Sequence, residues 1–335
     1  MRAFFTRLLS LAVITTLLAT AGVWWWINEP LTLNLLQGAQ VLDLEIEPGS
    51  SANAVAGVVT ASGVALPTPL LQAWFRLSGE ARQIKAGSYE IAPGTTPRTL
   101  LSMLVRGDQA LKSITLVEGW NFSQVRSALQ KAEQLAPDSS ALSPETIMEK
   151  IGMPGIHPEG RFFPDTYTYA KGASDLAVLK RAARAMDKRV DAAWSQRSPQ
   201  TPLKTANDAL ILASIVEKET GRPADRGQIA GVFTNRLRIG MLLQTDPSVI
   251  YGLGDKFEGA LRKRDLQTDT PYNTYTRAGL PPTPIAMPGR AALLAAVQPT
   301  PTKAFYFVAR GDGTSQFSAS LDEHNRAVNK YIRGK

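Results

Sequence analysis

Two glutamates near the end of one predicted helix are the residues of this sequence best placed for acid–base chemistry. The segment that starts at Thr205 has a capping-box pattern with Asp208 and predicts a helix over 206–220. Glu217 and Glu219 fall in its last turn. A carboxyl group held at the end of a helix can give and take a proton, which is the chemistry of general acid–base catalysis.

The helical repeat distinguishes the two glutamates. Glu219 follows Ile215 by four residues and Val216 by three, so it continues an apolar stripe, whereas Glu217 falls roughly opposite. Burial at the end of such a stripe raises the pKa of a carboxyl group, and a protonated carboxyl suits the cleavage of a glycosidic bond. A solvated surface pair around Lys218 is the alternative, and helix geometry alone does not decide between the two.

Polar and aromatic residues that suit carbohydrate binding follow in two later segments. Gln244 and Asp246 stand in an otherwise apolar region, and Asn273 and Tyr275 precede a proline-rich loop over 279–285. Amide and carboxylate groups can bind sugar hydroxyls, and an aromatic ring can stack on a sugar face. The same residues would also fit a helix N-cap at Asp246 and a rigid structural loop.

The end of the chain predicts a β-hairpin over 305–318 and a closing helix over 321–332. Asn325 on that helix is a secondary candidate for the site, together with Glu217. His157 and His324 are far apart in sequence and are expected to be surface or packing residues rather than metal ligands.

Several other chemistries find no support in the residues. The chain has no cysteine, which excludes a disulfide framework, a thiolate zinc site and a cysteine nucleophile. The sequence also lacks the P-loop, the dinucleotide-binding loop, the GxSxG elbow and the HExxH helix. We therefore expect no metal and no cofactor.

The chain of 335 residues is basic, with a formal net charge of +8. Its lysines and arginines are scattered among acids, and the densest cluster, 262–264, is short and has no nucleic-acid-binding motif beside it. We therefore expect a basic surface that faces an anionic membrane or wall, and no nucleic-acid partner.

An almost unbroken apolar run over 8–27 predicts a transmembrane helix. Arg2 and Arg7 precede it, so the positive-inside rule places the N-terminus in the cytoplasm, and Trp24–Trp26 fit the outer interface. A cleaved signal peptide is the alternative, with a small-x-small site at Ala19–Ala21, but the apolar run continues past that site. Both interpretations export the rest of the chain.

The pattern of the whole chain predicts an α+β protein in three parts. Residues 1–28 form the cytoplasmic tip and transmembrane helix, residues 41–110 a small β-α-α-β unit, and residues 111–335 a mixed α+β catalytic domain. Expected strands cover 41–46, 83–91 and 114–117, and expected helices cover 52–60, 69–77, 96–104, 121–136, 173–197, 206–220 and 228–239.

Ordered blocks along almost the entire chain resemble one known family. The blocks SIVEKETG, FTNRLRIGM, LQTDPSVIYGLG, TPYNTYTRAGLPPTPIAMPG, FYFVARGDG, DEHNRAVNKY and EGRFFPDTYTY are together similar to the YceG-like family of endolytic murein transglycosylases. The small unit, with PGSSANAVAGVV and KAGSYEI, resembles the LysM-like portion of that family. Binding of N-acetylglucosamine-containing glycans and a simple spacer role are both open for this unit.

The resemblance implies a specific reaction. The family cuts bacterial peptidoglycan inside its glycan strands, between N-acetylmuramic acid and N-acetylglucosamine, and leaves 1,6-anhydro-muramic ends without consuming water. Its catalytic glutamate corresponds to Glu219, the second acid of the Glu-Lys-Glu triplet. The resemblance further implies a single-pass inner-membrane protein with a periplasmic catalytic domain, which terminates new strands beside peptidoglycan synthases.

Two alternatives remain at this point. A water-using muramidase would employ Asp246 or Glu217 as a second carboxylate. A scaffold without catalytic activity would bind the wall and cut nothing. A nucleic-acid-binding protein conflicts with export.

Overall fold

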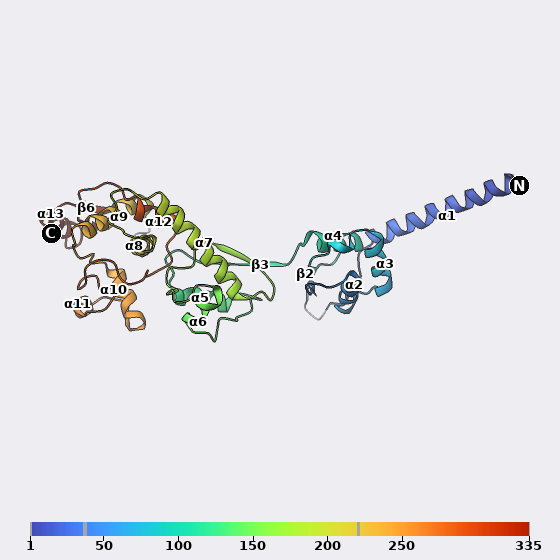
Figure 1. Ribbon diagram of the computed structural model, residues 1–335, viewed down its shortest axis with the longest axis horizontal. Helices are drawn as coiled ribbons and strands as arrows, with labels where there is room; N and C mark the ends of the chain where they lie inside the picture. Colours follow the sequence, from blue (N-terminus) through green and yellow to red (C-terminus); the bar gives the residue numbers. More distant parts are fainter. Residues whose placement is uncertain (1, 36–38, 220–221, 335) are drawn as a thin grey trace. The chain divides into compact units, whose positions relative to one another are not determined.

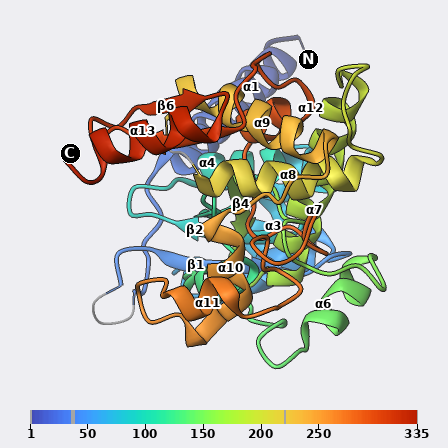
Figure 2. The same ribbon diagram turned by 90° about the vertical axis from the view of Figure 1, so that its left-hand side faces the viewer.

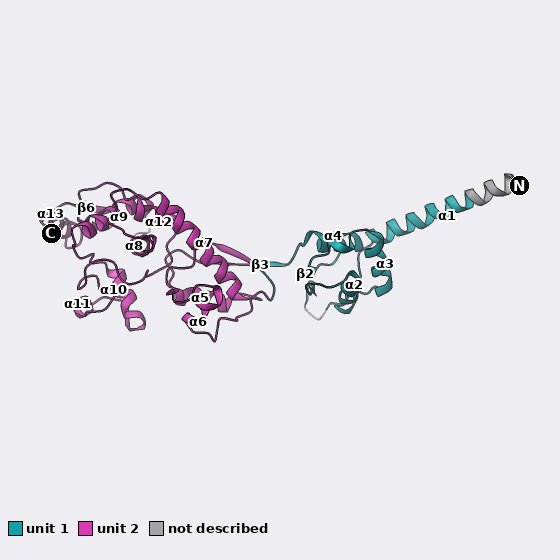
Figure 3. Ribbon diagram, in the orientation of Figure 1, with its two compact units in different colours: residues 1–112, 170–172 teal, residues 113–169, 173–335 magenta. Residues whose placement is uncertain are grey.

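The computed structural model describes residues 2–35, 39–219 and 222–334, which form helices and short strands in two compact units (Figures 1 and 3). The first unit consists of residues 1–112 and 170–172, and the second of residues 113–169 and 173–335. The mixture of helices and strands confirms the expected α+β class.

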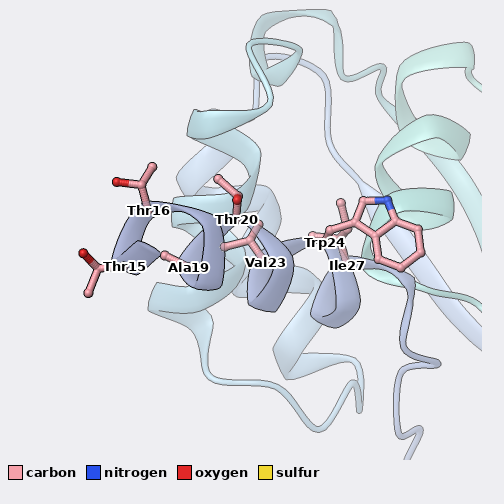
Figure 4. Close-up of a pocket in the computed structure, with 7 residues that line it drawn as sticks. All are labelled: Thr15, Thr16, Ala19, Thr20, Val23, Trp24 and Ile27. Atoms are coloured by element: carbon pink, nitrogen blue, oxygen red, sulfur yellow. The ribbon is translucent and has the colours of Figure 1, made fainter. Parts of the chain in front are cut away.

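The first unit begins with helix α1 (Arg2–Asn28), whose span Ser10–Asn28 is long and apolar enough to cross a membrane. It is the one such span in the described part of the chain, and it fits a membrane anchor or a signal sequence. Threonine hydroxyls interrupt its apolar surface, as the close-up in Figure 4 shows for Thr15, Thr16 and Thr20. Each donates to a backbone carbonyl one turn earlier, so the helix satisfies these groups without water.

The rest of the first unit surrounds a two-stranded antiparallel sheet. Strand β1 alternates buried and exposed residues, and Leu44 on its inner face pairs with Tyr89 of β2. Thr96 closes a capping box at the start of the last helix, and Gly107 ends that helix in the left-handed region. The elements are β1 (Leu42–Ile46), α2 (Ala52–Ala61), α3 (Thr68–Leu77), the 3₁₀ turn η1 (Ala81–Gln83), β2 (Gly87–Ile91) and α4 (Pro97–Arg106).

The second unit is mainly helical, with two small sheets. Strand β3 pairs with β4, and β5 forms an antiparallel hairpin with β6, as expected for the end of the chain. The elements are β3 (Leu111–Thr115), α5 (Phe122–Lys131), α6 (Pro144–Ile151), β4 (Thr166–Ala170), α7 (Asp175–Ser195), α8 (Ala206–Glu219), α9 (Pro223–Arg238), α10 (Asp246–Leu253), η2 (Gly254–Lys256), α11 (Lys263–Gln267), α12 (Arg290–Val297), β5 (Tyr306–Ala309), β6 (Ser315–Ser318) and α13 (Leu321–Tyr331).

Helix α8 is the central helix of the second unit. It packs against α7, α9 and α12, and Figures 1 and 2 show these helices side by side. Every residue from Ala209 to Val216 is buried, so the helix is enclosed all round rather than amphipathic. The expected contrast between a buried face and an open face is therefore absent, and the side chain of Glu217 is only 7% exposed.

Two helix boundaries differ from those expected. The helix predicted over 121–136 ends at Lys131, because the chain turns there and Gln134 adopts a positive φ of 57°. The helix predicted over 228–239 begins five residues earlier, at Pro223, which occupies a first-turn position that suits proline. Neither difference moves Glu219, which is the last residue of α8.

Candidate active site

Glu219 lies at the end of the buried helix α8 and borders a polar cavity of about 470 Å³. This volume is within the range of small-molecule sites in proteins. The lining residues come from α8, α9, the start of α10 and the segment before it, the loop between α11 and α12, the hairpin and the closing helix. They are Glu219, Arg236, Gln244, Asp246, Tyr275, Tyr306, Phe307, Leu321, His324 and Asn325.

A second and more open cavity, of about 640 Å³, meets the first at the same glutamate. The two linings have Glu219 in common and no other residue. The second cavity is lined by Glu219, Arg222, Pro223, Ala309, Gly313, Thr314 and Ser315. Glu219 therefore borders two separate spaces, which suits a chain-like ligand that continues in both directions.

The environment of Glu219 favours its protonated form. Burial raises the pKa of the Glu219 carboxyl to about 7, and the negative charge of Asp246 acts in the same direction. A hydrogen bond from Thr245 and the positive charge of Arg236 oppose this rise. Near neutral pH the carboxyl group is therefore divided between its two forms, which is what a group that acts first as acid and then as base requires.

Thr245 holds the Glu219 carboxylate in place. Its hydroxyl donates to Glu219 Oε1, while its backbone N–H donates to Thr274 Oγ1 at 3.0 Å. The hydroxyls of Thr274 and Ser248 are 2.9 Å apart, and these residues are almost fully buried. A connected hydroxyl network behind a catalytic group fixes its rotamer. Our sequence reasoning missed Thr245, because it reads as an ordinary helix-start residue.

Thr245, and not Asp246, occupies the N-cap position of α10. Its hydroxyl makes no capping bond to that helix, since it is directed to Glu219 instead. The N-cap interpretation of Asp246 is therefore wrong. Asp246 is the first residue of the helix, and its Oδ1 accepts a hydrogen bond of 2.6 Å from the Tyr275 hydroxyl.

Three of the four predicted binding residues line the cavity beside Glu219, namely Gln244, Asp246 and Tyr275. Gln244 has a positive φ of 49°, which is unusual for a residue with a side chain. Its backbone N–H donates to Thr274 O at 3.0 Å, so the strained conformation is tied to the hydroxyl network. Asn325 of α13 also lines this cavity.

Asn273 has a different environment. It is 1% exposed and is not among the residues that line either cavity. Its amide nitrogen donates to three backbone carbonyls between Asp265 and Thr268, and its Oδ1 accepts from Tyr275 N at 2.9 Å. The side chain thus shapes the loop that carries Tyr275, and a sugar contact by Asn273 stays a prediction.

Glu217 is likewise not among the described residues that line either cavity. Its Oε2 accepts from Gly289 N at 2.9 Å, and its Oε1 lies 3.5 Å from the guanidinium of Arg226. Burial raises the pKa of Glu217, with opposing effects from Gly289 and Arg226. These contacts connect α8 to the start of α12 and to α9, so the Glu217 side chain joins three helices.

Another part of the lining of the first cavity includes Arg236 and Tyr306, which sequence patterns did not single out, and His324, which lies on the closing helix beside the secondary candidate Asn325. The guanidinium of Arg236 lies 5.3 Å from the centre of the Tyr306 ring, and the Tyr306 ring stacks on His324 at 5.2 Å. These residues come from α9, β5 and α13, so only the folded chain brings them together. His324, expected to be a surface or packing residue, lines the cavity.

A partly buried, protonatable glutamate that lines two cavities is the kind of site found in enzymes that cleave polysaccharides. The profile of the YceG-like family matches residues 44–330, and the chain belongs to this family. This confirms the resemblance found in the sequence.

Known relatives share both sequence and structure with the chain. It is 32% identical over 312 residues to the endolytic murein transglycosylase of Bacillus subtilis (strain 168), a match that covers 88% of this chain and 86% of that protein. It is 27% identical to the Streptococcus pneumoniae (strain D39) protein of the same description, over 75% of this chain and 51% of that one. A crystal structure of a YceG-like protein from Listeria monocytogenes superposes with a TM-score of 0.55 and 27% identity, over 85% of this chain and 98% of that chain.

Proposed function

We propose that this protein is an endolytic lytic transglycosylase that cleaves the β-1,4 bond between N-acetylmuramic acid and N-acetylglucosamine inside peptidoglycan strands. Two relatives described as endolytic murein transglycosylases support the reaction class. The observation that carries the proposal is the position of Glu219, a partly buried glutamate that lines both cavities. A strand that occupies both cavities presents an internal bond to this group, which suits cleavage away from strand ends.

Glu219 begins the reaction as a general acid. Its proton passes to the glycosidic oxygen as the bond from that oxygen to the muramic C1 breaks, and the N-acetylglucosamine leaves with a free 4-hydroxyl. A pKa near 7 keeps enough of the group protonated for this step at neutral pH. The hydrogen bond from Thr245 directs one carboxyl oxygen, so the other is available to the substrate.

The same carboxylate then acts as a base. It accepts the proton of the muramic C6 hydroxyl while that oxygen bonds to C1, which forms the 1,6-anhydro ring and restores the protonated carboxyl group. An internal nucleophile has a high effective concentration, so no second carboxylate is needed to position water. Gln244, Asp246 and Tyr275 line the cavity beside Glu219 and are proposed to bind the sugar.

A water-using muramidase is the second candidate function, and one observation favours it. Asp246 lines the first cavity and is the only other carboxylate in either lining of the described residues. It would need to activate water, although its Oδ1 already accepts from Tyr275. Glu217 is less suitable, since both of its oxygens contact Gly289 and Arg226.

Product masses separate these functions. Purified murein is digested with the wild type, with Glu219→Gln and with the matched control Glu217→Gln. We expect anhydro-muramic ends, one water lighter than reducing ends, from the wild type and from the Glu217 variant, and no products from Glu219→Gln. Reducing ends would establish the muramidase, and strand binding without any cleavage by the wild type would establish a scaffold.

The proposal extends to the location of the protein. We propose that α1 anchors it in the inner membrane with a cytoplasmic N-terminus, and that residues 111–335 act in the periplasm on newly made strands beside their synthases. The β-α-α-β order and antiparallel pairing of residues 41–110 support a LysM-like, glycan-binding assignment for the first unit. Protease added to spheroplasts should degrade the catalytic part, whereas protection in intact spheroplasts would contradict this topology.

A further inference from the structure

Arg236 is a buried cation in the wall of the first cavity. It is 6% exposed, and in the described part of the chain it takes part in no ion pair. Its Nε donates to Phe305 O at 2.7 Å, and its Nη1 donates to Leu243 O at 2.7 Å and to Leu242 O at 3.4 Å. Nη2 has no acceptor among the described residues.

The negative charge of Glu219 acts on Arg236 from the same cavity, but no carboxylate of the described residues forms an ion pair with it. A buried charge without a direct partner is costly unless a ligand completes it. Burial lowers the pKa of Arg236, yet a guanidinium stays charged at neutral pH. Two of its nitrogens are fixed by backbone carbonyls, and its face lies over the Tyr306 ring, so the free nitrogen is held in one direction. Such a preorganised donor suits a carboxylate or carbonyl oxygen.

The glycan of peptidoglycan contains one carboxyl group, whereas acetamido carbonyls occur on both of its sugars and therefore do not distinguish them. Its two sugars differ in the 3-O-lactyl ether of muramic acid, which ends in a carboxyl group. That carboxyl is free in strands without peptides and is an amide where a peptide stem is attached. Arg236 is the one lysine or arginine that lines the first cavity, while Arg222 in the second cavity already has an interaction partner.

We infer that Arg236 forms a subsite for the lactyl carboxyl group, so that the first cavity takes the muramic residue of the scissile bond and the second takes the N-acetylglucosamine. The inference rests on the proposed function and adds the register of the strand to it. A strand shifted by one sugar would place N-acetylglucosamine beside Arg236, and this sugar has no lactyl carboxyl group to pair with the guanidinium. Glu219 therefore lies beside the glycosidic oxygen on the muramic C1, and not beside the linkage from the C1 of N-acetylglucosamine.

Binding to the full-length Glu219→Gln protein in detergent micelles tests the subsite without cleavage. Three tetrasaccharides are titrated by calorimetry, namely a peptide-free muramyl tetrasaccharide, the same compound with peptide stems, and chitotetraose, which has no lactyl group. We expect the peptide-free muramyl compound to bind about tenfold or more tightly than chitotetraose, as a charge-assisted contact provides. If the stem-bearing compound binds more tightly than chitotetraose by the same factor, the ligand of Arg236 is the lactyl amide carbonyl. If the stem-bearing compound binds no more tightly than chitotetraose, the ligand is the free lactyl carboxylate.

Arg236→Gln, added to Glu219→Gln, should bind the muramyl compound and chitotetraose equally, with chitotetraose affinity unchanged. The matched control is Arg238→Gln in the same background. Arg238 is an exposed residue of the same helix that contacts Asn235 and Gln200 and lines neither cavity, so its loss should keep the preference. Retained preference in the Arg236 variant would overturn the inference.

The bonds from Arg236 to Phe305 and Leu243 also support the fold, so a second measurement leaves the protein intact. A muramyl tetrasaccharide whose lactyl carboxyl is reduced to an alcohol is titrated into Glu219→Gln. We expect its affinity to fall to that of chitotetraose, and unchanged affinity would overturn the subsite. Digestion of murein by the wild type separates failure of the subsite from failure of the proposed function. Anhydro products from the wild type, together with no binding preference for the muramyl compound, refute only the subsite. No cleavage of murein refutes the proposed function.

Discussion

Thr245 occupies the N-cap position of α10, yet its hydroxyl donates a hydrogen bond to Glu219 at the end of α8. One side chain thus gives up a local contact and joins two segments at the candidate active site. A capping bond is worth roughly 1 kcal/mol, so the redirected hydroxyl is a costly arrangement for the helix alone. It is accounted for by the position that it gives to the Glu219 carboxylate.

Replacement of Thr245 should therefore impair the reaction more than substrate binding. Thr245→Val keeps the side-chain shape but loses the donor, and we expect kcat to fall about tenfold or more, since a hydrogen bond to a charged group is worth about 1.5–3 kcal/mol. KM should change little. Thr245→Ser is the matched control, because it keeps the hydroxyl and should retain most of the activity. Equal loss in both variants would show that the hydroxyl is not the cause.

The pH dependence of catalysis should report the Glu219 carboxyl. The first step needs its protonated form, so kcat/KM should fall as the pH rises through about 7. Asp246 raises this pKa, so Asp246→Asn should move the fall to lower pH, whereas Thr245→Val should move it to higher pH. Rate profiles of the three proteins between pH 5 and pH 9 check the opposite shifts, and shifts in one common direction would contradict the assignment.

Glu219 should also reduce the stability of the fold at neutral and alkaline pH. Its pKa is about 7 in the folded protein and near 4.5 when unfolded, so the folded state holds the proton more tightly. The contribution of the Glu219 carboxyl to the free energy of unfolding is fully present below pH 4.5 and is lost as the pH rises through 7. Glu219→Gln cannot ionise, so at pH 8 it should exceed the wild type by up to about 3 kcal/mol in the free energy of unfolding. Urea unfolding at pH 4.5 and pH 8 checks this, and an equal difference at both values would contradict it.

Sequence patterns singled out Glu219 and Asp246, but not Thr245 and Arg236, which also act on the Glu219 carboxyl. The capping box of Thr205 and Asp208 marks the start of α8 within the chain itself, and the family resemblance selected the second glutamate. Thr245 and Arg236 act through contacts with residues 26 and about 70 positions away, to Glu219 and Phe305. No local pattern reports such contacts. The helix face does not distinguish Glu219 from Glu217, because neighbouring helices bury α8 on all sides from Ala209 to Val216.

Variants of Asn273 and Tyr275 test whether Asn273 holds the loop that carries Tyr275 or contacts the sugar. Asn273→Ala removes three bonds to backbone carbonyls from a buried position, so we expect a loss of roughly 2–3 kcal/mol in the free energy of unfolding. Tyr275→Phe removes only the hydroxyl that donates to Asp246, and should weaken muramyl binding with little loss of stability. Denaturant unfolding and calorimetric binding of both variants separate the roles. A stable Asn273 variant with reduced binding would instead support a direct contact with the sugar.

Glu159 supports the site from a buried position outside it. The carboxyl group is 3% exposed and accepts from Phe122 N at 3.1 and 3.2 Å and from the Tyr251 hydroxyl at 3.1 Å, so it joins the start of α5 to α10, the helix that begins at Asp246. Its pKa is raised by burial to about 7. Glu159→Ala leaves the Phe122 N–H and the Tyr251 hydroxyl without a partner, and should cost about 3 kcal/mol in the free energy of unfolding and raise KM through displacement of α10. Glu159→Gln can still accept both bonds and should retain activity; inactive but stable Glu159→Gln would show that the negative charge itself, and not the anchoring of α10, serves the reaction.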